Sequence, residues 1–486
     1  MLLPWAILVG LTLRSGPYGL TEEGAKALLV AWSIGDAVAS AAFTLGAPDI
    51  RVIFFLPLGF FWPGQVIAAK VLTLLTMAGA GVALYRWRRR DDQAEAALLA
   101  TGLLLIAPLT VDSINSLSAA PFLLGIFASA AWLNRTLLGE RATFGGSFFA
   151  QLLACAAAVT LHPAGMAYPA LLFFKWWRNP PDQRHRGHFL AGIPLVVLLA
   201  LTMHLGWSGM IWGQNPLPAA AAVFRGSRTE GPLSGGEWLG ALALIALTAA
   251  VAWHESRRLL ADLTGGTLLL GVLCGAVAAD RTWGMLMLTL LLYGGLPWLL
   301  RLCAPLAGRG LLVERGWLWL LLLLICTAFM RRDRSDFEAG RRQLLSAEDQ
   351  LISDFAEGVN NMRGGDGAGN GHSAAPILVA SSWPARTSIA CRCDGLPLPP
   401  AAKDPGSQLA MMRGVSYLIL ADSPDNLLLA SNFAQLGPRI EVLSRQPGGV
   451  ILHFKAPAAQ PPAAQPPAAR PPAAQPPAAQ LHSAQL

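Results

Sequence analysis

The stretch "VIAAKVLTLLTMAGAGVALYRWRRR", residues Val66–Arg90, decides how the chain folds. It holds about twenty mostly apolar residues, the length that an α-helix needs to cross the hydrocarbon core of a bilayer. Its Leu, Ala and Gly content suits a helix, whereas a membrane barrel would show short alternating strands. A run of arginines follows at once. The segment is therefore expected to be a transmembrane helix whose basic end faces the cytoplasm.

The same character extends over most of the chain. Of its 486 residues, 54% are hydrophobic and only 13% are charged, and the mean hydropathy is +0.47. A soluble domain usually carries about a quarter charged residues. We therefore expect an all-α polytopic membrane bundle with a small C-terminal α/β extramembrane domain. Apolar runs place about eleven transmembrane helices, near 1–13, 65–85, 94–110, 117–133, 145–161, 163–177, 189–211, 238–253, 264–279, 283–300 and 316–330.

The net charge of +7 is better explained by membrane topology than by nucleic-acid binding, because the basic residues lie mostly in short loops between apolar runs. By the positive-inside rule these loops are cytoplasmic, and the alternate loops are external. The external loops are expected to carry most of the isolated acidic residues and one long stretch: Glu22, Glu23, Asp36, Asp49, Asp112, residues 213–237, and Asp280 with Arg281.

Composition divides the chain into four parts. Residues 1–330 form the transmembrane domain, and 331–375 hold an amphipathic helix and a Gly-rich flexible linker. Residues 376–455 alternate strand-like and helix-like runs, which predicts a small external α/β domain. From 456 to 486 the sequence repeats "QPPAA" and cannot bury a core, so a disordered tail is expected.

The stretch "PYGLTEEGAKALL", Pro17–Leu29, raises the first question of function. Thr21 can cap a helix there, and Glu22 and Glu23 in its first turn suit the positive end of the helix dipole. An acidic pair at the outer rim of a membrane can also take the proton from an acceptor hydroxyl or amine. Glu23, then Glu22, and then Asp36 further along the same segment are the candidate catalytic residues.

Four other residues are candidates for substrate binding. Arg225 and Arg228 form a basic pair in an external loop, and the guanidinium fork matches phosphate oxygens, although exposed loop arginines are common. His162, beside Pro163, could hold a phosphate when protonated, although a hydrogen-bonded structural role is the plainer interpretation. Asp112 could contact an acceptor, but a helix cap is the more frequent role for such a residue.

Cysteine and motif content adds little chemistry. Cys391 and Cys393 form a C-x-C pair that is too small for a zinc site and whose two thiols are expected to be poorly placed to bridge each other. No metal ligands are assigned. P-loop, G-x-S-x-G, HExxH and CxxCH motifs are absent from the sequence, which disfavours hydride and ATP chemistry.

The order of parts resembles a known family. A short first helix is followed by "GLTEEGAKALL", an acidic pair at the start of a helical segment, and then by a proline-bearing stretch before the second span. The second span ends at its inner side in "LYRWRRR". The next apolar segments are "LIAPLTVDSINSLSAAPFLLGIFASAAWLNR" and "AVTLHPAGMAYPALLFFKWWR". This layout, over about Leu2–Arg178 and more loosely in the C-terminal domain, looks like the membrane-embedded GT-C glycosyltransferases. The resemblance implies a bundle with two interfacial helices in its first external loop.

It also implies an activity. The chain would move a sugar from a polyprenyl-phosphate donor to a lipid, polysaccharide or protein acceptor on the periplasmic face of a bacterial inner membrane. The lipid-linked donor would then be the essential small-molecule partner, no nucleic acid is expected, and a divalent metal is left open. Two alternatives stand beside this hypothesis: a transporter or flippase of lipid-linked precursors, and a GT-C-like scaffold that has lost catalysis.

Overall fold

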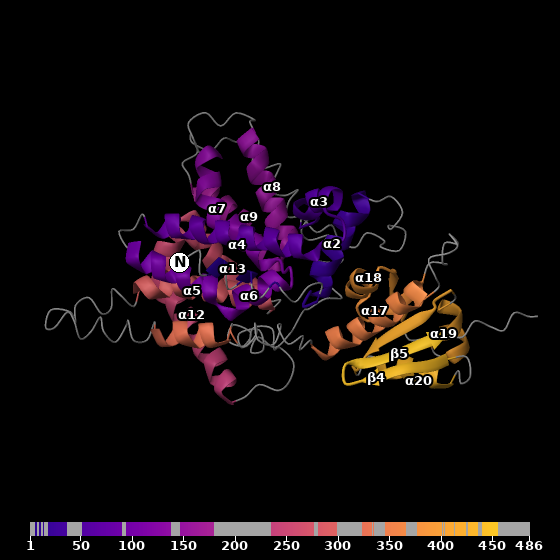
Figure 1. The fold of residues 1–486 in the computed structure, drawn as a ribbon. Helices are drawn as coiled ribbons and strands as arrows, with labels where there is room; N and C mark the ends of the chain where they lie inside the picture. Colours follow the sequence, from indigo (N-terminus) through magenta and orange to yellow (C-terminus); the bar gives the residue numbers. More distant parts are fainter. Residues whose placement is uncertain are drawn as a thin grey trace, which may run out of the picture.

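A computed structural model describes the chain in stretches separated by gaps. In Figure 1 these stretches form a body of helices, coloured from indigo through magenta to pink and light orange, and a smaller orange and yellow domain that contains a sheet. The expected helical bundle with a small C-terminal α/β domain is therefore confirmed. The described residues are 5–6, 9–10, 13, 18–35, 51–89, 94–137, 146–178, 235–276, 280–298, 323–332, 334, 346–365, 377–400, 402, 404–412, 414–423, 426–435 and 440–454.

The number of spans is smaller than expected within these stretches. Two described helices, α4 (Val66–Arg89) and α12 (Gly235–Ala261), are long and apolar enough to cross a membrane. A third span arises if α5 (Ala94–Ile106) and α6 (Pro108–Asn115), which are bent by 51°, count as one. The predicted total of about eleven is therefore not confirmed.

The remaining apolar predictions fall on shorter helices or outside the described residues. Spans expected near 189–211, over most of 1–13 and over the first half of 316–330 lie in residues that the structure does not describe, as does the tail after 454. The other described helices of the bundle are α7 (Ala120–Leu137), α8 (Gly146–Leu161), the 3₁₀ turn η2 (Pro163–Met166), α9 (Ala167–Arg178), α13 (Leu263–Gly275), α14 (Arg281–Leu290) and the π-helical turn η4 (Leu291–Gly295).

The break between α5 and α6 follows from a proline. Residues before proline avoid the helical region, and Ala107 is extended (φ −64°, ψ 135°), so the segment expected as one span over 94–110 turns at this point. Pro108 then starts α6 at a position where its missing N–H does no harm. Every residue of α6 from Pro108 to Ile114 is buried. The turn therefore carries the polar groups of α6, Asp112 among them, into the bundle.

Two short helices lie beside the bundle, as the sequence predicted for the first external segment. Thr21 caps α2 (Glu22–Gly35), because its hydroxyl accepts the N–H of Gly24 at 3.1 Å. The helix α3 (Arg51–Phe61) packs closely against it, and a Cβ at Gly59 would collide with the backbone of Ala31. At its far end α3 exposes the large apolar side chains of Phe60, Phe61 and Trp62, as an interfacial element does.

The C-terminal domain is a five-stranded sheet in the order β2-β1-β3-β5-β4. β1, β2 and β3 are mutually parallel, and β5 pairs antiparallel with β3 and β4. The last two strands, β4 and β5, form an antiparallel hairpin. The strands are β1 (Leu378–Ser381), β2 (Asp394–Pro397), β3 (Tyr417–Ala421), β4 (Ile440–Gln446) and β5 (Gly449–Phe454).

Helices cover both faces of this sheet. The amphipathic helix α17 (Ala347–Gly365) buries Leu351 and Phe355 against Tyr417 and Ile451 on one face, together with α18 (Pro384–Cys391). On the other face, α19 (Pro405–Met411) is followed by Met412, which packs with Phe433 of α20 (Leu427–Gln435). Ala385 and Ile389 of α18 belong to the hydrophobic core of the membrane bundle. The domain is therefore seated on the bundle through α18.

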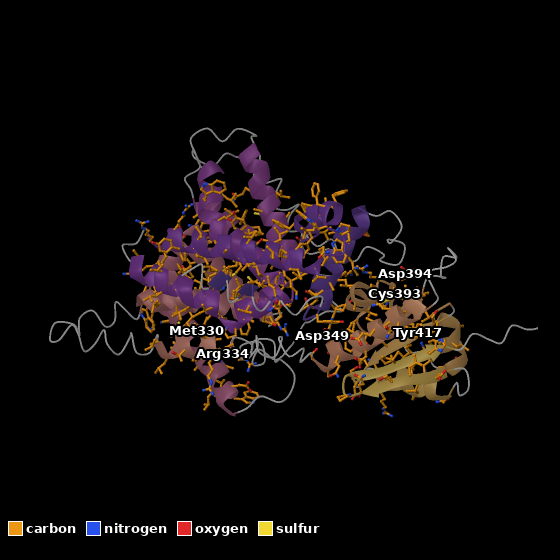
Figure 2. All side chains as sticks on the ribbon, viewed as in Figure 1. Met330, Arg334, Asp349, Cys393, Asp394 and Tyr417 are labelled. Carbon is orange, nitrogen blue, oxygen red and sulfur yellow. A yellow bond between two sulfur atoms is a disulfide. The ribbon has the colours of Figure 1, made fainter. Side chains whose placement is uncertain are left out.

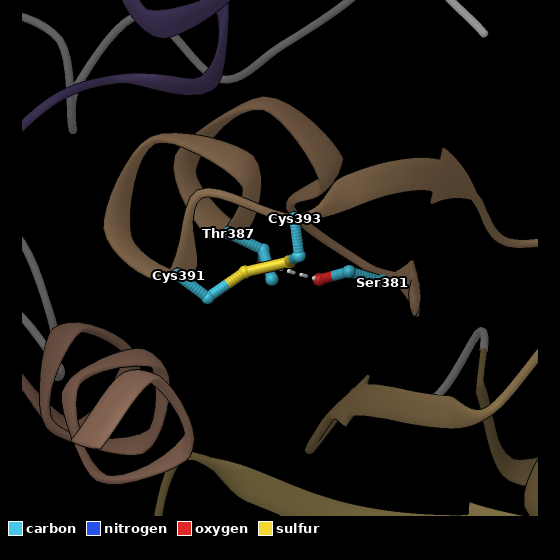
Figure 3. Close-up of a disulfide and its surroundings, with 4 residues drawn as sticks. All are labelled: Ser381, Thr387, Cys391 and Cys393. Atoms are coloured by element: carbon cyan, nitrogen blue, oxygen red, sulfur yellow. Dashed lines mark hydrogen bonds between the residues drawn. A yellow bond between two sulfur atoms is a disulfide. The ribbon is translucent and has the colours of Figure 1, made fainter. Parts of the chain in front are cut away.

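The two cysteines of the C-x-C pair form a disulfide, contrary to the expectation from their spacing. Figure 3 shows the Cys391–Cys393 bond at the end of α18, next to a hydrogen bond of 2.8 Å between Ser381 and Thr387. Arg392 between them is in the left-handed conformation (φ 51°, ψ 45°), which ends the helix and turns the second thiol back toward the first. The local turn, which residue spacing alone does not reveal, makes the bridge.

Candidate active site

Charged side chains gather at one end of the bundle, where the starts of α2 and α3 meet the turn after α6. The backbone oxygen of Ser116 accepts both the N–H and the hydroxyl of Thr21, at 3.2 and 2.9 Å. The backbone oxygen of Leu117 accepts Nη1 of Arg51 at 2.8 Å. The charged members of this end, which we call the rim cluster, are Glu22, Glu23, Arg51, Asp112, His162, Asp280 and Arg281.

Glu23 is the accessible carboxylate of the rim cluster. Its side chain is 46% exposed, and one oxygen lies 3.9 Å from Nη2 of Arg51, whose own side chain is only 2% exposed. That distance is too long for a hydrogen bond, so Arg51 supplies positive charge without occupying the oxygen. The carboxylate is thereby kept beside a fixed cation and open to an approaching donor. Asp49, the acidic residue nearest to Arg51 in the sequence, lies outside the described residues.

Glu22 points elsewhere and is engaged by the C-terminal domain. Its two oxygens accept the backbone N–H groups of Ala385 and Arg386, at 2.7 and 3.2 Å. Burial raises the pKa of Glu22, while the two amides and the nearby guanidinium of Arg386 oppose that rise. Adjacent residues of a helix diverge by about 100°. The two members of the acidic pair therefore have different surroundings.

Asp112 pairs with Arg281 at the buried side of the rim cluster. Oδ2 of Asp112 lies 3.0 Å from Nη1 of Arg281, and the two side chains are 6% and 29% exposed. Asp112 lies inside α6 and does not cap it, so the expected cap is wrong. Arg281 was missed as a site residue, although its predicted position in an external loop next to Asp280 was a usable signal.

His162 caps η2 and faces Asp280. Its Nδ1 accepts the N–H of Ala164 at 3.1 Å, which places the ring proton on Nε2. Nε2 lies 3.2 Å from Oδ1 of Asp280, and Asp280 in turn caps α14 by accepting the N–H of Trp283 at 3.0 Å. This hydrogen bond fits the structural role considered for His162, and its contact with a phosphate stays a prediction. This arrangement fixes the loop that presents Arg281.

Three of the candidate residues cannot be placed in the site. Asp36, Arg225 and Arg228 lie outside the described residues, so their positions stay predictions. Within the described stretches, no group of three or more His, Cys, Asp or Glu side chains is arranged to hold a metal ion.

Replacing Gly24 by Ala tests how closely α2 must approach the turn after α6. A Cβ at this position would collide with the backbone oxygen of Ser116 and lie 2.9 Å from Cβ of Leu117. Because backbone cannot yield as a side chain does, we expect the free energy of unfolding to fall by about 1–3 kcal/mol. Unfolding in detergent measures it. In the control Gly79→Ala, where nothing lies within 4 Å, an unchanged or higher stability is expected; equal losses in both would refute the close approach.

Comparison with known proteins defines the fold class. No protein-family model matches the chain, and no curated protein sequence matches it. The crystal structure of ArnT from Cupriavidus metallidurans in the apo state aligns with a TM-score of 0.52 and 14% identity, over 92% of this chain and 95% of that one. The chain therefore shares the overall fold of this ArnT structure.

Two further solved structures are similar. ArnT from the same organism bound to undecaprenyl phosphate aligns with a TM-score of 0.54 and 12% identity, over 93% of this chain and 96% of that one. The archaeal oligosaccharyltransferase AglB from Archaeoglobus fulgidus, in complex with an inhibitory peptide and a dolichol-phosphate, gives a TM-score of 0.47 and 10% identity, over 86% and 69% of the two chains. The two ArnT structures carry the fold assignment, over nearly the whole length of both chains.

Proposed function

We propose that the chain is a membrane glycosyltransferase that moves a sugar from a polyprenyl-phosphate donor to an acceptor hydroxyl or amine. The observation that carries the proposal is the exposed Glu23 carboxylate beside the buried Arg51, at the start of an interfacial helix of a GT-C fold. An ArnT structure with the same fold binds undecaprenyl phosphate, which supports a lipid-linked donor. Such a donor reaches the protein within the bilayer, so the enzyme needs no nucleotide.

In this reaction Glu23 acts as the general base. It takes the proton of the acceptor as the acceptor oxygen or nitrogen bonds to the anomeric carbon of the sugar. The bond between that carbon and the phosphate oxygen breaks, and the electron pair leaves with the polyprenyl phosphate. Arg281, a half-exposed cation of the rim cluster, is proposed to stabilise the phosphate, with Arg225 and Arg228 proposed to assist. Glu22 serves to hold the C-terminal domain.

The rim cluster is proposed to face the periplasm of a bacterial inner membrane. The described contacts gather at one end the residues that the loop charges assign to the outside, Glu22, Asp112 and Asp280 among them. The C-terminal domain is seated at this same end through α18. We infer that both lie outside the bilayer, where a glycan, lipid or protein acceptor of the cell envelope can approach.

A transfer assay in vesicles tests the proposed function. Purified protein in vesicles that contain a polyprenyl-phosphate sugar is expected to release polyprenyl phosphate when envelope lipid or glycan acceptors are present, and to ignore nucleotide sugars. Mass spectrometry of the lipid extract measures both lipids. Movement of uncleaved donor between leaflets would instead support a transporter. If a full panel of acceptors gives neither cleavage of the donor nor its movement between leaflets, the result would support the scaffold hypothesis.

A further inference from the structure

The N-terminus of α18 is capped by a residue from the other end of the chain. Trp383 stands at the cap position and has no side chain that caps, while Pro384 removes one of the N–H groups at this helix end. The next two N–H groups, of Ala385 and Arg386, both go to the carboxylate of Glu22, 363 and 364 positions away. A carboxylate suits this place, because the helix dipole and free amides favour an anion. The contact therefore caps the N-terminus of α18 and links α18 to α2.

A second group of contacts surrounds this cap. Arg386 reaches Glu348 at 2.6 Å and Asp349 at 2.7 Å, and its side chain is 10% exposed. The other oxygen of Asp349 accepts the N–H of Gly19 at 3.2 Å, just before α2. Figure 2 shows Asp349 where α17 comes nearest to the helical body. Charge-assisted hydrogen bonds of this kind are stronger than neutral ones and fix orientation.

Tyr18, the residue before Gly19, makes two more hydrogen bonds at this junction. The hydroxyl of Tyr18 donates to Oγ of Ser353 at 2.9 Å, and the backbone oxygen of Tyr18 accepts Nζ of Lys70, which is fully buried in α4. Residues 18–22 are thus held from two sides: by the C-terminal domain through Ser353, Asp349 and α18, and by the bundle through Lys70 and Ser116. Glu23 is the next residue of the chain.

We propose that the C-terminal domain is a positioning element of the membrane site, which holds Glu23 in place by binding Glu22 at the N-terminus of α18. The proposal rests on the proposed function, since it assigns a role in the transfer reaction. Glu23 makes no hydrogen bond with its side chain among the described residues, and its ion pair with Arg51 is 3.9 Å long. Its orientation therefore depends on how firmly the first turn of α2 is held. Glu22 and Arg386 act through that turn and do not touch substrate.

Replacing Arg386 by Ala tests the proposal in the full-length protein. Loss of the guanidinium leaves Glu348 and Asp349 without their shared cation, loosens α18 from α17 and removes a positive charge near Glu22. The hold of α18 and Asp349 on the start of α2 is thereby weakened. We expect kcat of transfer to fall by about 10- to 100-fold, because a misplacement of about 1 Å has effects of this size. KM for the lipid-linked donor should change little, since no donor contact is removed. Hydrogen exchange of the α2 amides should increase in the same variant.

Three further variants separate positioning from general damage to the domain. The carboxylate of Asp404 caps α19 by accepting the N–H and the hydroxyl of Ser407. Asp404→Ala removes this cap and leaves the junction with α2 intact, so kcat should stay within about twofold of the wild type. Arg386→Lys should recover part of kcat, because it keeps a charge for one carboxylate. Glu22→Gln combined with Arg386→Ala should lower kcat by less than the product of the two single effects, because both changes weaken the same junction.

The outcomes distinguish this inference from the proposed function. An active wild type whose Arg386→Ala variant loosens α2 but keeps its kcat would overturn the positioning role and leave the transferase standing. An equal fall of kcat in Asp404→Ala would also overturn it, because the loss would then reflect the domain's stability alone. If the wild type transfers no sugar, the proposed function fails, and the positioning role fails with it.

Discussion

Replacement of Glu23 by Gln is expected to lower kcat of sugar transfer by about a thousandfold, in the middle of the range for loss of a general base. Glutamine has nearly the same shape but cannot accept the acceptor's proton. The side chain is 46% exposed, and its contact with Arg51 is long, so folding should be unaffected. Initial rates with a saturating lipid-linked donor, together with the unfolding midpoint of each variant, measure the effect.

The neighbouring carboxylate makes this prediction sharper. Glu22→Gln keeps one oxygen that can accept an N–H of α18 but loses the second acceptor and the negative charge. We expect a smaller fall in kcat than for Glu23→Gln, of the size predicted for Arg386→Ala. Glu357→Gln is the matched control, because Glu357 is an exposed carboxylate of α17, on the domain that binds Glu22. Activity of Glu23→Gln within a few-fold of the wild type would remove Glu23 as the base.

Arg281→Ala is expected to lower the free energy of unfolding by about 3 kcal/mol, because it leaves the carboxylate of Asp112 buried without its cation. Asp112 is 6% exposed and lies 3.0 Å from the guanidinium, so water cannot readily replace the lost partner. Adding Asp112→Asn to this variant should restore most of the stability, since the buried charge is then gone. Transfer activity should not return, because Arg281 is proposed to stabilise the leaving phosphate.

Unfolding in detergent at several denaturant concentrations measures the stability of the three proteins. The control is Arg257→Ala on α12, whose side chain is exposed, so a loss below about 1 kcal/mol is expected. Failure of Asp112→Asn to rescue the Arg281→Ala variant would show that the pair is not what stabilises this end of the bundle. Recovery of activity in the double variant would remove Arg281 from the proposed mechanism.

Much of the fold could be predicted because its signals are local. Hydropathy over about 20 residues identifies α4 and α12 as helices that can span a bilayer. The cap at Thr21 and the turn between β4 and β5 follow from the residues at those positions. The bend between α5 and α6 was missed, although Pro108 marks it, because an apolar run of the right length was interpreted as one span. The count of spans depends on such breaks.

The site was predicted less completely, because its partners are distant in sequence. Glu22 and Glu23 could be selected as unusual carboxylates in an apolar chain, and the loop charges assign Asp112 and Arg281 to one side. Nothing in the spacing of these residues indicates that Asp112 pairs with Arg281, 169 positions away by their numbers. The bridge between Cys391 and Cys393 likewise depends on a left-handed Arg392 that composition does not reveal.

By itself the sequence determined that the protein is a helical membrane bundle with a small α/β domain. The length of an apolar run and the alternation of strand-like segments are local features, which can be recognised without knowing the tertiary contacts. Only the tertiary structure decided the roles of the two adjacent glutamates. They are equal in charge and in local pattern, but α18 arrives from residue 384 onward and binds one of them, leaving the other exposed beside Arg51. A carboxylate's role depends on which groups surround it, and here those groups come from distant parts of the chain.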